Sequence, residues 1–453
     1  MQLERLIAAL APTDVVGGGA PEIRELAYDA REVPRDSLFF CVPGAKADGH
    51  DFAAAAVEQG AVALVVERPL ELEVPQLVVP SARAAMPLAA VEFFGDPTAE
   101  LPVAAVTGTN GKTTTAYLLA SILATAGEQP GLLTNVERRV GDDVREVGLN
   151  TPESIDLQRL FRQMLAAGNR VCVMEATSMA SSKGRLEGTR FAVLVFTNLT
   201  QDHLDFHGTM EEYFESKRRL FAQAAQAVVN VGDEYGARLA SELPGAITFR
   251  PDDGLGAVRL KLQGRFNVEN ALAAAAAARA LGVDDETIRA GLEALDRVPG
   301  RFERVDEGQP FTVLVDYAHT PGALETALRS ARELDRGRVI CVFGAGGDRD
   351  RSKRPLMGQV VSELADVAVV TSDNPRGEDP ASIASEVAGD LELDIELDRR
   401  RAIERALESA RAGDVVVIAG KGHEQGQEIA GRKLPFDDRE VARDALRALR
   451  APA

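Results

Sequence analysis

Tryptophan is absent from this 453-residue sequence, and cysteine is limited to three residues. Cys41, Cys172 and Cys341 each lie in an apolar, strand-like stretch, and none belongs to a CxxC pair. This pattern excludes a disulfide framework and indicates buried free thiols in a reducing compartment. Long hydrophobic runs are also missing, since the longest obvious one, residues 271–278, is far shorter than the ~20 residues of a membrane span. Residues 1–10 favour a short amphipathic helix over a signal peptide, so we expect a cytoplasmic protein.

The sequence lacks an excess of positive charge. Its 51 Lys and Arg residues are outnumbered by 70 Asp and Glu residues, which gives a formal net charge of −19. Sequence-independent binding to nucleic acid needs a basic surface, so we expect no nucleic-acid partner. A small anionic substrate is compatible with this composition if basic residues cluster locally. Hydrophobic residues make up 45% and charged residues 27%, an ordinary globular mixture. The length predicts about two to four domains.

Strand-like apolar runs alternate with helical periodicity along the chain, which indicates α/β architecture. Stretches with proline and glycine near residues 95–102 and 298–300 divide the chain into three sections. We therefore predict domains over residues 1–100, 101–300 and 301–453. Strand-like runs in the last section are each followed by a polar or glycine-rich loop, and they cover residues 311–315, 338–343, 367–371 and 414–419.

Residues 103–115 (VAAVTGTNGKTTT) carry the strongest local signal, a predicted strand followed by a glycine loop and a helix. Gly108 and Gly111 allow backbone N–H groups to converge on phosphate oxygens. Lys112 would place its charge on the β- and γ-phosphates, and the Thr113 hydroxyl can bind Mg²⁺. The loop departs from a standard P-loop in having valine where the first glycine would stand. The alternative is a glycine-rich turn capped by threonine.

The five histidines all lie in polar, loop-like contexts. His203, His319 and His423 come shortly after predicted strands, where open α/β sheets build their sites. Glu175 ends a strand predicted over residues 171–174, so Glu175 and His203 could meet near a nucleotide-bound Mg²⁺. Taken alone, each of these residues is more often an ordinary polar group of a loop.

Five motifs, in the same order and over nearly the whole chain, resemble the Mur ligases of peptidoglycan synthesis. They are residues 107–115 (TGTNGKTTT), 197–208 (TNLTQDHLDFHG), 213–221 (YFESKRRLF), 264–270 (GRFNVEN) and 316–321 (DYAHTP). The resemblance implies three domains: a small α/β uridine-binding domain over residues 1–100, a central P-loop ATPase-type parallel sheet over 101–300, and a Rossmann-like amino-acid-binding domain over 301–453. It also implies a monomer.

Two further stretches resemble those members of the family that add the third residue of the stem peptide. They are residues 29–33 (DAREV) and 47–52 (ADGHDF). Residues 373–376 (DNPR) resemble the meso-diaminopimelate-adding members, as opposed to the lysine-adding ones. The resemblance thus implies an ATP-dependent ligase that joins meso-diaminopimelate to the D-Glu carboxylate of UDP-N-acetylmuramoyl-L-alanyl-D-glutamate through an acyl phosphate.

The resemblance also implies a role for individual residues. It makes Lys112, Glu175, His203 and Lys217 catalytic, with Lys217 carbamylated. The ATP contacts would be Gly108, Thr109, Asn110, Gly111, Lys112, Thr113, Thr114, Asn267, Arg301 and Asp316, with His319 closing over the nucleotide. The Mg²⁺ ligands would be Thr113, Glu175, His203 and Lys217. The UDP-sugar-peptide contacts would be Arg31, Asn150, Thr151, Thr177, Lys183 and Arg185. The amino-acid contacts would be Arg349, Asp373, Asn374, Pro375, Arg376, Gly420 and Glu424.

Several alternatives stay open at this point. Lys217 by itself would be a surface helix residue beside two arginines, and residues 373–376 by themselves would be a turn. Asn150, Met179 and Lys183 stand where the family usually has Thr, His and Gln, which indicates either harmless drift or an altered acceptor. The competing functions are a sister ligase, such as folylpolyglutamate synthase or a lysine-adding homologue, and a nucleotide-binding module that is not an enzyme.

Overall fold

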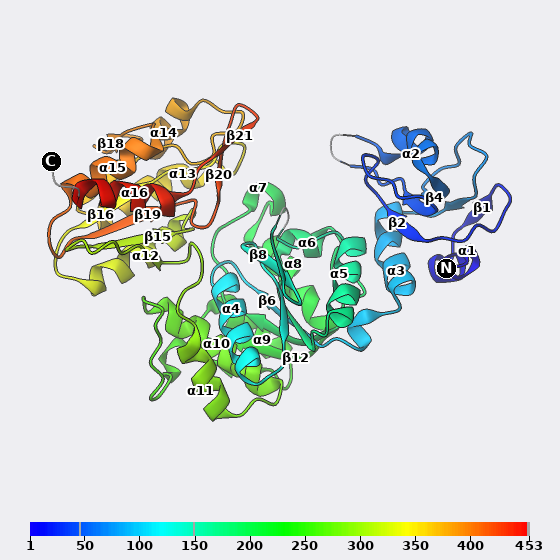
Figure 1. Cartoon of the computed structure of the whole chain (residues 1–453), viewed down its shortest axis with the longest axis horizontal. Helices are drawn as coiled ribbons and strands as arrows, with labels where there is room; N and C mark the ends of the chain where they lie inside the picture. Colours follow the sequence, from blue (N-terminus) through cyan, green and yellow to red (C-terminus); the bar gives the residue numbers. More distant parts are fainter. Residues whose placement is uncertain (45–46, 148–149, 451–453) are drawn as a thin grey trace. The chain divides into compact units, whose positions relative to one another are not determined.

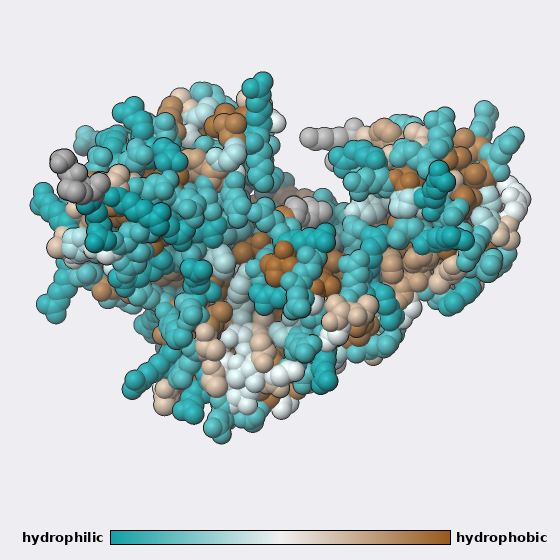
Figure 2. All heavy atoms as spheres, viewed as in Figure 1, coloured by the Kyte–Doolittle hydropathy of each residue, from teal (hydrophilic) through white to brown (hydrophobic). Residues whose placement is uncertain are grey.

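The computed structural model describes residues 1–44, 47–147 and 150–450 (Figure 1). The chain forms two compact units, each made of several segments. The first comprises Met1–Ala105, Glu128–Leu194 and Ser216–Gln226, and the second comprises Val106–Gly127, Val195–Glu215 and Ala227–Ala453. The visible surface is mostly hydrophilic, with apolar residues in small scattered groups, as the charged composition predicts (Figure 2).

The N-terminal part of the first unit is a five-stranded sheet in the order β1-β5-β4-β3-β2. Its strands are β1 (Asp14–Val16), β2 (Glu25–Ala27), β3 (Ser37–Phe40), β4 (Ala61–Val66) and β5 (Gln76–Val78), and all but β1 pair in parallel. Successive strand residues point to opposite faces, so Phe40 packs with α1 (Leu3–Leu10) and α3 (Ala82–Phe94), whereas Phe39 packs with α2 (Ala53–Gln59). The predicted amphipathic helix at the N-terminus is confirmed.

An eight-stranded sheet has the order β13-β12-β11-β6-β10-β7-β8-β9. Its strands are β6 (Val103–Thr107), β7 (Pro130–Leu133), β8 (Glu137–Val140), β9 (Asp143–Glu146), β10 (Val171–Glu175), β11 (Phe191–Phe196), β12 (Ala224–Asn230) and β13 (Ile247–Phe249). β7 and β10 pair in parallel, as do β12 and β13, whereas β8 and β9 add an antiparallel edge. Every residue of β6 is buried, which suits a central strand covered on both faces.

Helix α4 (Lys112–Thr125) follows β6 and packs against α10 (Phe266–Ala280) and α11 (Asp285–Ala294). The alanine run of α10 is buried. Its small methyl groups let neighbouring helices approach closely. Gly291 likewise permits close packing of α11 on α4, since a Cβ atom there would lie 2.4 Å from the Ile122 Cα atom. Helix α5 (Ser154–Ala166), in the first unit, packs against α3.

The C-terminal part is a six-stranded sheet in the order β14-β15-β19-β16-β17-β18, parallel except for β14. Its strands are β14 (Glu303–Arg304), β15 (Thr312–Asp316), β16 (Val339–Phe343), β17 (Val367–Val370), β18 (Asp394–Ile395) and β19 (Val415–Ala419). One face packs on α12 (Pro321–Leu334), α13 (Lys353–Leu364) and α14 (Pro380–Ala388), and the other on α15 (Arg399–Ser409) and α16 (Asp438–Arg450). A hairpin of β20 (Gly426–Ile429) and β21 (Arg432–Pro435) stands apart from the sheet.

The α/β class is confirmed, and the four C-terminal strands fall within a residue or two of their predicted ends. All three cysteines are buried, as expected. The description of every histidine as a loop residue was wrong. His50 lies in a 3-10 helix and His207 ends α7 (Leu204–His207), and both are buried.

None of the helices in the described part of the chain is both long enough and apolar enough to span a membrane.

Candidate active site

The glycine loop between β6 and α4 has the predicted strand, loop and helix order. Gly108 (φ +142°) and Gly111 (φ +84°) both adopt backbone conformations that favour glycine. A Cβ atom at Gly108 would lie 2.0 Å from the Thr197 Oγ1 atom, and one at Gly111 would lie 2.3 Å from the Asn270 Oδ1 atom. The two glycines are therefore required both by the turn and by the close approach of neighbouring side chains.

A second loop, which follows β11, holds the glycine loop in place. The Asn110 backbone N–H donates to the Asn198 Oδ1 atom at 2.9 Å. The Thr109 hydroxyl donates to the Thr200 carbonyl at 3.2 Å and lies 3.1 Å from the Tyr213 hydroxyl. The Lys112 ammonium donates to the carbonyls of Gly108 (3.0 Å) and Thr109 (2.6 Å), so it curls over the loop where a phosphate would bind.

Arg301 contacts the first turn of α4. Its guanidinium donates to the Thr113 hydroxyl at 3.0 Å and lies over the Tyr317 ring, 4.3 Å from the ring centroid. The carboxylate of Asp316 accepts from the backbone N–H groups of Phe302 (2.6 Å) and Ala318 (2.9 Å). Burial raises the Asp316 pKa, although the Arg301 charge opposes the shift. Asp316 thus fixes the backbone that presents Arg301.

Asn267, predicted to contact ATP, lies on the face of α10 near the glycine loop. Its side chain donates to the Gln263 carbonyl at 2.6 Å and accepts from the Asn270 amide at 3.0 Å. Asn270 in turn contacts Gly111 closely. We did not single out Asn270 from the sequence, although its position three residues after Asn267 places both on one helix face.

A buried carboxylate, Asp202, lies among cationic groups. It accepts from the His203 backbone N–H at 2.9 Å, and its Oδ2 atom is 3.4 Å from the His203 Nε2 atom. Burial would raise its pKa, but the charges of His203, His319, Lys353 and Lys112 outweigh burial and lower it. Sequence reasoning missed Asp202 and the buried Lys353. The signal available for Asp202 was its place in the 197–208 motif.

Glu175 and Lys217, both predicted metal ligands, are each only 1% exposed. Glu175 ends β10 and accepts from the Asn135 backbone N–H at 3.0 Å. Lys217 lies near the end of α8 (Met210–Arg218). Its burial shows that the alternative of a solvated helix face was wrong, because lysine is almost never fully buried unless it is paired.

Three of the residues predicted to bind the UDP-sugar peptide lie together. The Thr151 hydroxyl donates to the Glu175 carbonyl at 3.0 Å and is 3.2 Å from the Thr177 hydroxyl. Arg185 donates to the Thr151 carbonyl at 3.2 Å and pairs with Glu153 at 2.8 Å. Glu153 was not predicted.

The other three residues of that set are Asn150, Lys183 and Arg31. Asn150 is exposed, and Lys183 is the C-terminal cap of the short helix α6 (Ser178–Ser182). Arg31 is exposed and pairs with Asp29 at 2.5 Å. That pair lowers the pKa of the Asp29 carboxyl.

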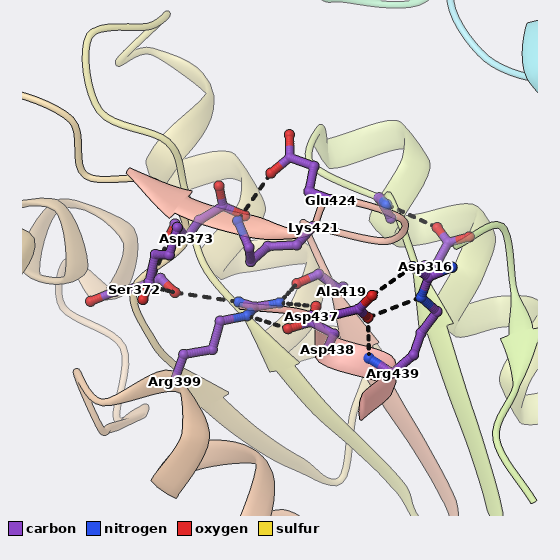
Figure 3. A network of polar contacts seen from close by, with 12 residues as sticks. Asp316, Ser372, Asp373, Arg399, Ala419, Lys421, Glu424, Asp437, Asp438 and Arg439 are labelled. Carbon is purple, nitrogen blue, oxygen red and sulfur yellow. Dashed lines mark hydrogen bonds and ion pairs between the residues drawn. The ribbon is translucent and has the colours of Figure 1, made fainter. Parts of the chain in front are cut away.

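The loops after β17 and β19 bring together most of the residues predicted to bind the amino acid, among them Asp373 and Glu424 (Figure 3). Asn374 accepts from the Lys421 ammonium at 3.0 Å and donates to Glu424 at 2.8 Å. Lys421, which is completely buried and was not predicted, also pairs with Glu424 at 3.0 Å. Within the described residues the buried Oδ2 atom of Asp373 has no hydrogen-bond partner.

Arginines flank this group. Arg376 donates to the Gly347 carbonyl at 2.7 Å and lies 3.4 Å from Glu428. Arg349 is exposed, and no hydrogen bond or ion pair engages its guanidinium within the described part of the chain. Gly420 has φ +114°, and a Cβ atom there would lie 2.5 Å from the Asp373 Oδ2 atom. Pro375 begins a turn, since the Glu378 backbone N–H donates to its carbonyl at 3.0 Å. The DNPR stretch therefore belongs to the candidate site and leads into a turn.

The fold and the site define a multidomain α/β protein built to bind a nucleotide. The features that indicate this are the glycine loop, the buried Asp202 near Lys353, and the polar loops of the C-terminal part. The chain matches three family descriptions in succession: "Mur ligase family, catalytic domain" over residues 22–97, "Mur ligase middle domain" over 106–251, and "Mur ligase, glutamate ligase domain" over 300–422. The chain belongs to the Mur ligase family, a class of ATP-dependent ligases.

Among its relatives is "UDP-N-acetylmuramoyl-L-alanyl-D-glutamate--2,6-diaminopimelate ligase" of Geobacillus thermodenitrificans, 46% identical over 99% of this chain and 100% of the relative. A protein of the same name from Aquifex aeolicus is 42% identical over 94% of each chain. A solved structure of that name is 31% identical, with a TM-score of 0.64 over 95% of this chain and 96% of its own.

Proposed function

We propose that this chain joins meso-diaminopimelate to the D-Glu carboxylate of UDP-N-acetylmuramoyl-L-alanyl-D-glutamate, with hydrolysis of ATP to ADP and phosphate. The observation that carries this proposal is the joining of the DNPR loop to Lys421 and Glu424, in a chain whose glycine loop presents Lys112. Relatives that bear this activity in their names match nearly the whole chain. We place the reaction in the cytoplasm and expect a monomer.

The chemistry requires activation of the acceptor, because a carboxylate is a poor electrophile. The γ-phosphoryl group of ATP is transferred to a carboxylate oxygen and gives an acyl phosphate and ADP. The amine then attacks the carbonyl carbon, the C–O bond to phosphate breaks, and the nitrogen loses a proton. Lys112 and Arg301 supply the positive charge that phosphoryl transfer needs.

We propose that Glu175, His203, Thr113 and a carbamylated Lys217 hold Mg²⁺. Among the described residues no group of three or more His, Cys, Asp or Glu side chains is placed to hold a metal. Carbamylation would add the missing carboxylate, since it converts the buried Lys217 amine into an anion with the oxygen donors that Mg²⁺ prefers. Bound Mg²⁺ would offset negative charge on the transferring phosphoryl group.

The polar groups of the C-terminal loops match the two carboxylates and two amines of diaminopimelate. The Arg349 guanidinium is available for a carboxylate, and Arg376 is suited to hold a second one. The buried Oδ2 atom of Asp373 and the carboxylate of Glu424 suit an ammonium group. L-Lysine lacks one carboxylate and would leave an arginine unpaired.

We propose that the group of Thr151, Thr177 and Arg185 binds the muramoyl-peptide end of the acceptor, together with Asn150 and Lys183. Arg31 would bind the uridine end. These assignments go with domain boundaries near residues 100 and 300, so that residues 1–100 hold UDP, 101–300 hold ATP and 301–453 hold the amino acid.

The test measures phosphate release with ATP, Mg²⁺ and the UDP-muramoyl dipeptide, and with either meso-diaminopimelate or L-lysine. Turnover with diaminopimelate alone is the expected result. Turnover with L-lysine instead would retain the ligase and overturn the specificity. No turnover with either amine would contradict the proposed acceptor. The departures at Asn150 and Met179 would then indicate a different acceptor. Hydrolysis of ATP at the same slow rate without acceptor or amine would indicate a nucleotide-binding module.

A further inference from the structure

Arg399 begins α15 and is completely buried together with Asp438, which begins α16. The two side chains form a two-point ion pair. The Arg399 Nε atom donates to the Asp438 Oδ1 atom at 2.8 Å, and the Nη2 atom donates to the Oδ2 atom at 2.6 Å. A buried ion pair is poor evidence of stabilisation, because the loss of hydration offsets the attraction and an apolar pair of similar size often does as well.

The remaining donors of Arg399 reach the two loops that carry the candidate amino-acid site (Figure 3). The Nη2 atom donates to the carbonyl of Ala419 at 2.8 Å, at the last residue of β19. The Nη1 atom donates to the carbonyl of Ser372 at 3.4 Å, directly before Asp373. Gly420 follows Ala419 directly. Each carbonyl thus belongs to the residue immediately before a predicted substrate contact.

These two loops come from strands that are not neighbours. β16 lies between β17 and β19, so the sheet itself gives no direct hydrogen bonds between them. Arg399 joins their carboxyl ends from the helical layer formed by α15 and α16. On the side that carries the candidate site, Asn374, Lys421 and Glu424 also connect the loops. Gln427 of β20 adds hydrogen bonds to the carbonyls of Ser372 (3.3 Å) and Asp373 (2.9 Å).

We propose that Arg399, held by Asp438, is a positioning residue for amino-acid binding, because it sets the separation of the Asp373 and Gly420 loops. This inference rests on the proposed function, since it takes these two loops as the amino-acid site. Arg399 does not touch the substrate. Its sequence context hides the role, because Arg399, Arg400 and Arg401 form a charged run typical of a solvated helix face.

The decisive variant is Arg399→Lys. Lysine keeps the charge beside Asp438 but lacks the planar fork that reaches two carbonyls at once. Its matched control is Arg338→Lys at the amino ends of β16 and β19 in the same sheet. Arg338 also pairs with a carboxylate, Asp414, at 2.6 Å, and donates to a carbonyl, that of Ser409, at 2.8 Å.

Steady-state kinetics supply the first readout. We expect R399K to raise KM for meso-diaminopimelate about tenfold or more, with KM for ATP and for the UDP-muramoyl dipeptide within about twofold of the unaltered chain. R338K should leave all three KM values unchanged. An equal KM for diaminopimelate in R399K and R338K would overturn the proposal. If R399K does not fold, the double variant R399M/D438L, which removes both buried charges, takes its place.

Hydrogen exchange supplies a second readout that does not depend on activity. In R399K the backbone amides of residues 372–376 and 419–424 should exchange about tenfold faster, while residues 338–343 remain protected. Unchanged exchange in both loops would overturn the positioning role whatever the kinetics show. If R399K shows faster exchange but the unaltered chain shows no turnover with any amino acid, the proposed function is contradicted and the positioning role is not. Faster exchange with an unaltered KM would restrict Arg399 to a structural role and overturn the proposal.

Discussion

The guanidinium of Arg301 donates a 3.0 Å hydrogen bond to the hydroxyl of Thr113. Thr113 lies in the first turn of α4, where orphan backbone N–H groups favour anions. The same guanidinium is stacked on Tyr317, with 4.3 Å between its central carbon and the ring centroid. Arg301 is therefore held over the start of the helix by two contacts, and the stacking on Tyr317 requires a planar cation.

We predict that Arg301→Lys lowers kcat/KM for ATP by about 10- to 100-fold, because lysine loses the stacking and the fork geometry at a site of developing phosphoryl charge. Steady-state kinetics with varied ATP measure the change. Arg304→Lys is the matched control, since Arg304 lies three residues away, is half exposed and pairs with Asp306 at 3.3 Å. Equal values of kcat/KM for ATP in the two variants would show that Arg301 does not act at the nucleotide site.

Lys217→Ala should lower turnover by about 100-fold or more, and added bicarbonate should not restore it. The unaltered chain should lose activity in buffer depleted of carbon dioxide and regain it with bicarbonate. A carbonyl signal from ¹³C-labelled bicarbonate that appears in the unaltered protein and not in K217A would identify the carbamate directly. The exposed neighbour Arg218 gives the control, since Arg218→Ala should retain most activity. Near-normal turnover of K217A would contradict the assignment.

The sequence was sufficient for the strands and the phosphate loop, because hydrophobic periodicity and glycine spacing are local properties. The sequence alone could not predict that Lys217 is buried. The neighbouring residues, Arg218 and Arg219, favour a solvated helix face, and only tertiary packing buries the lysine. Lys421 and Arg399 were missed for the same reason. Their burial depends on partners that are distant along the chain, Asn374 for Lys421 (47 residues away) and Asp438 for Arg399 (39 residues away).

Arg354, whose side chain is fully buried, pairs with Glu378 at 2.8 Å and with Glu386 at 2.7 Å. The Arg354 hydrogen bonds lower the pKa of Glu378 from 4.5 to about 2. A carboxyl with a depressed pKa contributes stability that is fully present above its unfolded pKa and is lost as pH falls through the folded value. This contribution should therefore disappear between about pH 4.5 and pH 2.

We predict that Arg354→Met lowers the free energy of unfolding by about 1–3 kcal/mol near neutral pH, because charged hydrogen bonds are lost. The difference from the unaltered chain should shrink as pH falls from 4.5 toward 2. Denaturant unfolding at a series of pH values measures it. Arg351→Met, at an exposed partner of Glu386, should leave the free energy of unfolding nearly unchanged. A difference for R354M that does not depend on pH would show that packing alone explains the loss.

Gly420→Ala tests the approach of the β19 loop to Asp373. Alanine there would strain a backbone at φ +114° and place its Cβ atom 2.5 Å from the Asp373 Oδ2 atom. The strain should cost about 1–3 kcal/mol of stability, and the displaced carboxylate should raise KM for the amino acid about tenfold or more, with KM for ATP unchanged. Gly431→Ala in the β20–β21 turn separates the two effects, because its φ is +73° and nothing lies within 4 Å of the added atom. G431A should lose stability without a change in KM, so an equal KM in the two variants would place Asp373 outside the amino-acid site.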